Sequence, residues 1–245
     1  MENAGYVALS RQLTLRRELD IAANNIANAN TVGFKVEQLL TNSVAARPAR
    51  NDDIGYPTTF VMDNGVGRDF AQGSLEQTGR SLDVAIEAEG SFFTLQGPNG
   101  PLYTRDGRFT LSPEGVLVSA QGYPVLADGA ELRLDPEQGD LTISADGVVS
   151  QGVNRVGTLS VVRFAELGVL QKTGDGNYRN TSNAQPEAAT DARLRQGMIE
   201  QSNVNPLVEI TNLIEISRAY ERVTRIVEQT GDLSRRSVER LGRVS

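Results

Sequence analysis

The fold of this chain is decided by Asn24-Asn25-Ile26-Ala27-Asn28-Ala29-Asn30-Thr31-Val32-Gly33-Phe34-Lys35, at the end of an otherwise helical N-terminal segment. Four of its first seven residues are asparagine. Asparagine is a poor helix-interior residue because its amide competes with the backbone for hydrogen bonds. Gly33 suits a positive-φ turn after the helix, and Phe34 can then fold back onto apolar surface. The stretch predicts a helix end whose amides serve its own carbonyls or those of a neighbouring subunit.

Residues 3 to about 30 are expected to form a helix with two apolar stripes. The first stripe advances in steps of four, three and four residues and consists of Leu15, Leu19, Ala22 and Ile26. The second is offset from the first and consists of Tyr6, Leu9 and Leu13. Because one buried face would need only one stripe, this helix is predicted to contact two surfaces.

A second long helix is expected from Asn205-Pro206 to about Leu241. Asn205 is typical of an N-cap, and Pro206 is typical of the first helical position. A heptad seam with three-four spacing runs along this helix and consists of Leu213, Ile216, Tyr220, Val223 and Val227, followed by polar residues. At ~1.5 Å per residue, the helix would be about 50 Å long. A heptad helix at each end predicts that the termini pair with each other.

The middle of the chain is expected to be β-rich. Apolar residues alternate along residues 81 to about 165 of the region 81–199, and Asp-Gly or Asn-Gly pairs recur between them. The strongest hairpin signal is Asp106-Gly107, which fits a two-residue type I′ turn. Further turns are predicted at Asn99-Gly100, Asp128-Gly129 and Asp146-Gly147. Within this region, residues 171–196 are polar and are expected to form a return loop.

The predicted fold class is α+β. Residues 1–35 and 200–245 would form a terminal helical module in which the two helices pair like a coiled coil. Residues 36–80, which are broken by Pro, Gly and Asn, would form an extended linker with short strands. Residues 81–199 would form the central antiparallel β domain. A module with leftover apolar stripes needs neighbours, so this layout favours an assembly subunit over a self-contained enzyme.

The composition of the chain excludes several kinds of functional site. The chain has 245 residues, no Cys, no His and a formal net charge of −7. The missing residue types exclude disulfides, cysteine nucleophiles, Ser-His-Asp triads and zinc sites of the usual kind. The negative charge argues against a general nucleic-acid binder. No membrane span and no signal peptide are recognisable, so the chain is expected to be cytoplasmic unless export uses an uncleaved signal.

Carboxylates are the only realistic catalytic groups. Asp83, Glu87 and Glu89 lie near one predicted strand, and a carbohydrate-acting enzyme could in principle use a pair of them. The simpler interpretation is that they are solvated positions between apolar residues. Gly174-Asp175-Gly176 lacks the acidic spacing of a calcium loop, and Gly65-Val66-Gly67 lacks the third glycine of a dinucleotide site. No enzyme activity, cofactor or metal is therefore expected.

Two segments carry a resemblance to a known family. Residues 24–35, here called the N-terminal signature, closely resemble the N-terminal motif of the bacterial flagellar axial proteins of rod and hook. Gln196-Gly197-Met198-Ile199-Glu200-Gln201-Ser202-Asn203-Val204-Asn205-Pro206, here called the C-terminal signature, is similar to the second motif of that family, with Ile199 replacing the usual Leu. Ile214 to Glu221 resembles the terminal helix of the family. Leu82 to Ile86, Phe92-Phe93 and Tyr103 to Phe109 resemble its β domain. The similarity spans nearly the whole chain.

The resemblance implies a structural subunit that polymerises helically and transmits motor torque. The continuation beyond the terminal helix, through Leu241, is most similar to proximal rod members, with a distal rod or hook-type member as the alternative. Members leave the cytoplasm through the flagellar type III apparatus without a cleaved signal and assemble in the periplasmic rod. The implied partners are this chain itself, other proximal and distal rod proteins and the export apparatus, with no nucleic acid and no membrane insertion.

Candidate assembly contacts follow from the stripes and from the two signatures. In the N-terminal part they are Leu15, Leu19, Asn24, Asn25, Ile26, Asn28, Asn30, Gly33 and Phe34. In the C-terminal part they are Ser202, Asn203, Val204, Leu213, Ile216, Tyr220, Val223 and Val227.

Overall fold

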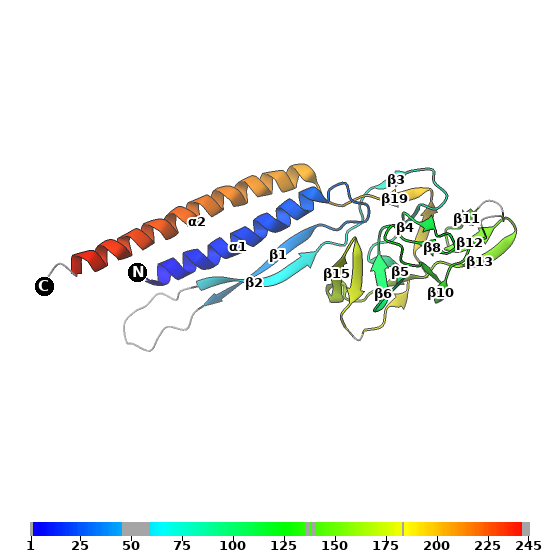
Figure 1. The fold of residues 1–245 in the computed structure, drawn as a ribbon, viewed down its shortest axis with the longest axis horizontal. Coiled ribbons are helices and arrows are strands. Elements are labelled where there is room, and N and C mark those ends of the chain that lie inside the picture. The colour runs from blue at the N-terminus through cyan, green and yellow to red at the C-terminus, as the bar shows by residue number, and fades with distance from the viewer. Residues whose placement is uncertain (1, 46–58, 136–137, 139–140, 183, 242–245) are drawn as a thin grey trace. The chain divides into compact units, whose positions relative to one another are not determined.

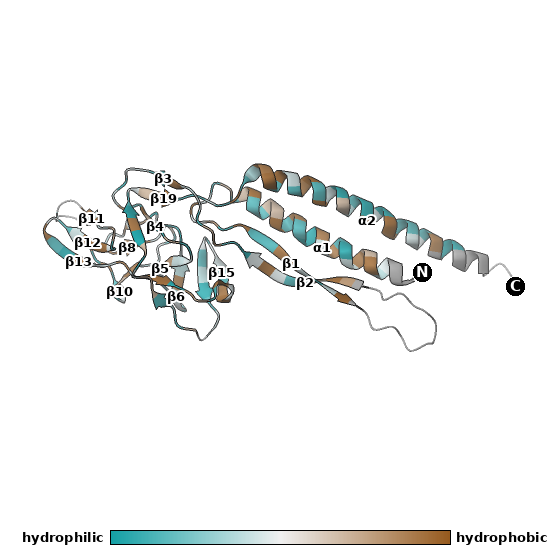
Figure 2. Cartoon of the chain, turned by 180° about the vertical axis from the view of Figure 1, so that it is seen from behind, coloured by the Kyte–Doolittle hydropathy of each residue, from teal (hydrophilic) through white to brown (hydrophobic). Residues whose placement is uncertain are grey.

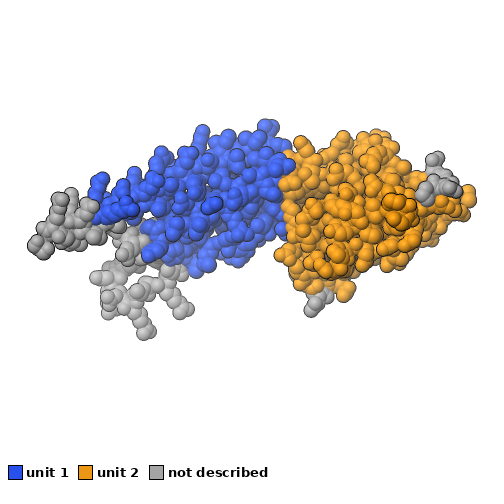
Figure 3. Space-filling view, viewed as in Figure 1, with its two compact units in different colours: residues 1–27, 37–68, 205–245 blue, residues 28–36, 69–204 orange. Residues whose placement is uncertain are grey.

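The computed structural model describes residues 2–45, 59–135, 138, 141–182 and 184–241, without the side chains of 2–4, 45, 59, 234 and 237–241. The chain forms two compact units, coloured separately in Figure 3. Unit 1 consists of residues 1–27, 37–68 and 205–245. Unit 2 consists of residues 28–36 and 69–204. An N-terminal helix, a central antiparallel β region and a C-terminal helix confirm the predicted α+β class.

Unit 1 contains two helices and a two-stranded antiparallel ladder. The helices are α1 (Glu2–Ala27) and α2 (Pro206–Leu241), and they lie side by side in Figure 1. They run antiparallel, since Gln12 Nε2 donates to Thr224 Oγ1 at 3.0 Å while Asn25 Nδ2 donates to Glu209 Oε2 at 3.0 Å. Apolar residues, brown in Figure 2, recur along both helices.

The start of α2 has the predicted cap. Asn205 Oδ1 accepts hydrogen bonds from the backbone N–H groups of Leu207 and Val208 at 3.1 Å and 3.5 Å. Pro206 is the first helical residue, where its missing N–H would have had no helical partner. The α1 helix ends at Ala27, a few residues before the expected end near residue 30, and the asparagine-rich turn follows it.

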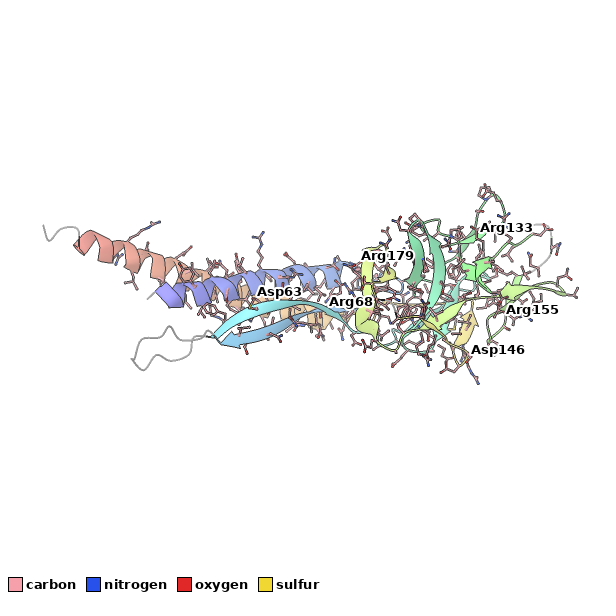
Figure 4. All side chains as sticks on the ribbon, turned by 90° about the horizontal axis from the view of Figure 1, so that it is seen from below. Asp63, Arg68, Arg133, Asp146, Arg155 and Arg179 are labelled. Atoms are coloured by element: carbon pink, nitrogen blue, oxygen red, sulfur yellow. The ribbon has the colours of Figure 1, made fainter. Side chains whose placement is uncertain are left out.

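The ladder of unit 1 consists of β1 (Glu37–Ala45) and β2 (Thr59–Arg68), with a register shift between Leu39 and Thr41. These paired strands are longer than the short strands expected for residues 36–80. One face lies toward α1, where the Arg17 guanidinium pairs with Asp63 at 2.9 Å. Asp63 and Arg68 on β2 are labelled in Figure 4. The division of the chain into the three predicted segments stays a prediction.

Unit 2 is built from short antiparallel strands. The strands before residue 120 are β3 (Leu75–Gln77), β4 (Val84–Glu87), β5 (Ser91–Gly97), β6 (Gly100–Thr104), β7 (Thr110–Leu111) and β8 (Leu117–Val118). The next are β9 (Leu126–Ala127), β10 (Ala130–Glu131), β11 (Leu141–Ile143), β12 (Val148–Gln151), β13 (Asn154–Thr158) and β14 (Val161–Arg163). The last are β15 (Leu170–Gly174), β16 (Asn177–Asn180), β17 (Glu187–Ala188), β18 (Arg193–Gln196) and β19 (Met198–Glu200), with a 3-10 helix at Leu167–Val169.

The largest sheet of unit 2 has the order β15-β16-β6-β5-β14-β17. Two apolar clusters pack within the unit. One is aliphatic and includes Val84, Leu95 and Leu117, whereas the other is aromatic and includes Phe92 and Tyr178, whose ring centroids are 5.8 Å apart. The β5–β6, β9–β10 and β11–β12 turns confirm the three further predicted turns, at Asn99-Gly100, Asp128-Gly129 and Asp146-Gly147.

The predicted hairpin at Asp106-Gly107 is wrong. Neither residue has a positive φ, and the chain continues beside β4, where the Val84 N–H donates to the Gly107 carbonyl at 3.0 Å. A Cβ on Gly107 would overlap the Val84 carbonyl oxygen, so glycine is needed for close backbone approach and not for a turn. Asp106 is buried and binds the Arg108 guanidinium at 2.7 Å.

The predicted polar return loop over residues 171–196 is also wrong. This segment contains β16, β17, β18 and most of β15. Its few large apolar side chains are the ones that are buried, as Tyr178 and Leu194 show with 2% and 4% exposure. Because most of the remaining residues are polar, composition concealed the strands.

Candidate assembly surface

Within unit 2, the turn after α1 joins the N-terminal signature to β19. The Thr31 N–H donates to the Asn28 carbonyl at 3.0 Å, and Thr31 Oγ1 lies 3.1 Å from Asn28 Oδ1. Gly33 has the predicted positive φ, at 70°, and its N–H donates to the Glu200 carbonyl at 2.8 Å. Phe34 is buried as predicted, with Lys172 Nζ 4.5 Å from its ring centroid. Asn30 is exposed.

Asn25 links three elements of unit 1 and is buried, with 1% exposure. Its Nδ2 donates to the Glu37 carbonyl at 2.8 Å as well as to Glu209, and its Oδ1 accepts from the Glu37 N–H at 3.0 Å. The amide therefore joins α1 to β1 and to α2. Asn24, the preceding residue, is exposed.

The C-terminal signature makes a matching set of contacts within unit 2. Asn203 Oδ1 accepts from the Val36 N–H at 2.8 Å, and Asn203 Nδ2 donates to the carbonyls of Asp69 and Ala71 at 2.9 Å and 3.1 Å. Ser202 Oγ accepts from the Val204 N–H at 3.2 Å, and both side chains are buried. One amide side chain thus holds three stretches of backbone together.

A buried charged cluster lies between the two signatures in unit 2. Lys35 Nζ donates to Glu200 Oε1 and to the Ala71 carbonyl, both at 2.6 Å. Arg105 Nε donates to Glu200 Oε2 at 2.7 Å, and its Nη1 donates to the carbonyls of Ala88 and Ser91 at 2.8 Å and 2.6 Å. The side chains of Lys35, Glu200 and Arg105 are each 1% exposed.

Burial sets the electrostatics of this cluster. Removal from water lowers the pKa of Lys35 and of Arg105, and the Glu200 carboxylate opposes both shifts. The cluster contains two cations and one carboxylate, so Glu200 is the group on which both cations depend. Sequence reasoning missed this cluster. The available signal was that Lys35 is one of only two lysines in the chain.

The seam residues of the helices are covered to different degrees. Leu15 is buried with 1% exposure, and Leu19 and Ile26 are half-buried. The α2 seam is half-buried along its whole predicted apolar part, which consists of Leu213, Ile216, Tyr220, Val223 and Val227. These side chains lie on the α2 face predicted to meet α1.

Exposed large apolar side chains are concentrated in unit 1. Thirteen are exposed among the described residues, and twelve of these belong to unit 1. On the helices they are Tyr6, Leu9, Leu13, Leu207, Val208, Ile210, Ile214, Ile226 and Leu233, and on the ladder they are Leu40, Val44 and Met62. The thirteenth is Val153 in unit 2. Exposed apolar surface gathered in this way is typical of an interaction site.

The two units also differ in net charge, which is concentrated in unit 2 and not in unit 1. Unit 1 contains thirteen basic and thirteen acidic residues, and unit 2 contains eleven basic and eighteen acidic residues. The whole net charge of −7 therefore belongs to unit 2. A neutral, apolar surface can pack against copies of itself without accumulating charge repulsion.

The carboxylates considered for catalysis have structural partners. Asp83 is buried with 1% exposure and accepts from Thr78 Oγ1 at 2.7 Å, so the expectation that it is solvated is wrong. Glu87 pairs with Arg195 at 2.9 Å, and this hydrogen bond lowers the pKa of the Glu87 carboxyl. Among the described residues, neither helix has a stretch long and apolar enough to cross a membrane.

Three family models match the chain. They are the flagellar hook protein FlgE/F/G D1 domain at residues 85–151, the flagellar basal body rod FlgEFG protein C-terminal at residues 195–240, and the flagella basal body rod protein at residues 6–35. The chain is 54% identical to the flagellar basal-body rod protein FlgF of Caulobacter vibrioides, over 100% of both chains. It is 32% identical to FlgF of Salmonella typhimurium, over 93% of both chains. It is 32% identical to FlgG of Buchnera aphidicola, over 83% of this chain and 86% of that protein.

Proposed function

We propose that unit 1 makes the contacts through which this chain assembles, because the chain belongs to the FlgF family of flagellar basal-body rod proteins. It is therefore a structural subunit of the proximal rod and not an enzyme. The observation that carries this proposal is the concentration of exposed apolar side chains, twelve of thirteen, in unit 1. The family association places the chain in the flagellum with other rod components. Full-length identity of 54% to a FlgF favours that paralogue over FlgG, at 32%.

The two helices are proposed to pair as a coiled-coil-like module in the rod. The packing of α2 against α1 supports this pairing, as do the half-burial and the heptad spacing of Leu213, Ile216, Tyr220, Val223 and Val227. Apolar residues outside the seam then remain available for neighbouring subunits. A contact between unlike surfaces that does not close by rotation gives a helical polymer, and stiff axial packing would transmit torque.

The proposed partners are this chain itself and other proximal and distal rod proteins. Export through the flagellar type III apparatus without a cleaved signal, followed by assembly in the periplasm, is proposed from the family association. Among the signature amides, Asn24 and Asn30 are exposed and suit contacts with neighbours, whereas the buried Asn25 and the network around Asn203 suit positions that hold the chain in shape. Asn28, Gly33 and Phe34 are proposed to support the turn.

Charged substitutions on the two units test the proposal. Leu13 is 62% exposed on α1, and Val153 is 100% exposed in unit 2. In a strain that lacks the native chain, Leu13→Asp is expected to abolish swimming and to remove the chain from purified basal bodies. Val153→Asp is the matched control and should leave both unchanged. Normal rods with Leu13→Asp, at equal chain abundance and thermal stability, would rule out unit 1 as the assembly module.

A further inference from the structure

The two helices of unit 1 leave separate apolar patches at its opposite ends. The α1-start patch consists of Tyr6, Leu9 and Leu13, which are 62%, 45% and 62% exposed. The α2-start patch consists of Leu207, Ile210 and Ile214, which are 77%, 43% and 46% exposed. Spacings of three and four residues place each patch on a single helix face.

The antiparallel helices set the distance between these patches. The end of α1 lies beside the start of α2, as the bond from Asn25 to Glu209 shows. The early part of α1 lies beside the later part of α2, as the bond from Gln12 to Thr224 shows. Since the α1-start patch precedes Gln12 or adjoins it, it lies at the end of unit 1 opposite the α2-start patch. The two patches therefore cannot cover each other within one chain.

The two ends also differ in charge. Before Arg218, the only charged residues of α2 are Glu209 and Glu215. From Arg218 to Arg240 the helix has six arginines against four acidic residues. A groove of about 240 Å³ at the α2-start end is lined by Glu209 and Glu215 together with Glu18 and Glu37. Glu18 pairs with Arg11 at 3.0 Å and Glu37 with Arg68 at 2.9 Å, so the acidic excess at this end comes from Glu209 and Glu215. The α2-start end is thus acidic, and the end that holds the α1-start patch lies beside the basic part of α2.

We propose that the α2-start patch of one subunit packs against the α1-start patch of the next rod subunit along the axis. The occupant is the N-terminal helix of a rod protein with the same pair of terminal helices, which the family models at residues 6–35 and 195–240 show to be shared. This inference rests on the proposed function and names the partner of that surface. Apolar patch meets apolar patch, and an acidic end meets a basic end.

Charge also decides against the symmetric alternative. Packing two α2-start patches together would bring Glu209 and Glu215 of one subunit against the same residues of the other, and like charges across an interface are unfavourable. The proposed contact joins unlike ends and is heterologous. Repetition of such a contact extends the assembly along an axis without closing it, which a rod requires.

Photo-cross-linking in assembled rods tests this contact. A benzophenone amino acid replaces Ile210 in the full-length chain, and basal bodies are purified and illuminated. Mass spectrometry of the cross-linked peptides is expected to find the first half of the N-terminal helix of a rod subunit. The same probe at Val153, which is 100% exposed in unit 2, is the control and should not reach that helix. Adducts from position 210 on a C-terminal helix or on a β domain, or no adducts in rods that contain the chain, would overturn the inference.

A charge-reversal variant tests the same contact quantitatively. Glu215→Arg should lower the yield of the position-210 cross-link about two- to fivefold, the range expected for a surface charge interaction. Glu187→Arg in unit 2 should leave that yield unchanged. An unchanged yield with Glu215→Arg would contradict the proposed pairing of acidic and basic ends. Absence of the unsubstituted chain from purified rods would instead refute the proposed function itself.

Discussion

At the scale of single residues, Glu200 is the side chain that joins the buried charged cluster of unit 2. Its carboxylate accepts from Lys35, from Arg105 and from the Gly73 N–H at 2.9 Å. A buried ion pair adds little over an apolar replacement of both partners, but removal of one partner leaves an uncompensated buried charge. In this cluster, removal of Glu200 would leave two such charges.

We expect Glu200→Gln to lower the free energy of unfolding of unit 2 by about 3–5 kcal/mol. Urea unfolding followed by tyrosine fluorescence would measure this, since Tyr103 and Tyr178 are buried in unit 2. Glu87→Gln is the matched control. It breaks the surface pair with Arg195, which is expected to contribute less than about 1 kcal/mol. Equal effects of the two substitutions would show that the buried cluster does not stabilise the unit.

Sequence patterns predicted some residue roles well and others not at all. The positive φ of Gly33 and the cap by Asn205 were predictable, because each depends on the few residues beside it. The pairing of Lys35 with Glu200 joins positions 165 apart, and no local period reports it. The sequence indicates that Asn25 is unusual for a helix, but only the structure shows that it bonds to Glu37 and Glu209.

At the scale of elements, the long helices were the most predictable parts. Their apolar periods extend over many residues, so both helices were located to within a few positions. The strands of unit 2 are short, and the segment around Asp106-Gly107 shows why local turn chemistry was insufficient there. An Asp-Gly pair fits a hairpin, yet this segment pairs with the start of β4 instead of folding back on itself. Tertiary pairing overrode local preference.

Gly107→Ala tests the explanation for that correction. The added Cβ would overlap the Val84 carbonyl oxygen, which belongs to backbone and cannot swing away. We expect a loss of about 2–3 kcal/mol or more in the free energy of unfolding. Gly168→Ala is the control, because its Cβ would meet no atom within 4 Å and its φ is not positive. If Gly107→Ala unfolds at the same urea concentration as the parent, close backbone approach is not what requires glycine at this position.

At the scale of the whole molecule, the net charge lies in one unit and the exposed apolar surface lies mostly in the other. Unit 2 has the entire net charge and buries its large apolar side chains, with Val153 as the exception among the described residues. Unit 1 has no net charge and leaves the second α1 stripe, Tyr6, Leu9 and Leu13, exposed. Composition averaged over 245 residues hides this contrast, since the two units together look like an ordinary acidic globular protein. The uneven distribution became visible only once the fold had grouped distant segments.

The grouping of residues 28–36 with unit 2 leads to the last prediction. These residues follow α1 directly, but Val32, Phe34 and Lys35 are buried within unit 2. The Asp69 N–H donates to the Val36 carbonyl at 3.0 Å, so a short glycine turn can replace residues 37–68. A chain of residues 28–36 and 69–204 joined in this way should unfold cooperatively.

A second chain, of residues 69–204 alone, should be less stable by about 3–6 kcal/mol, because burial of one Val and one Phe side chain is worth roughly 1.5–3 kcal/mol each. Loss of Lys35 would leave Glu200 paired with Arg105 and should add little to this difference, since one cation still meets the carboxylate. Urea unfolding of both chains measures the difference directly. Equal stability would mean that the N-terminal signature serves unit 1 alone. The expected difference would instead show that this segment completes the β domain, so that a subunit reaches its final fold only when both signatures are present.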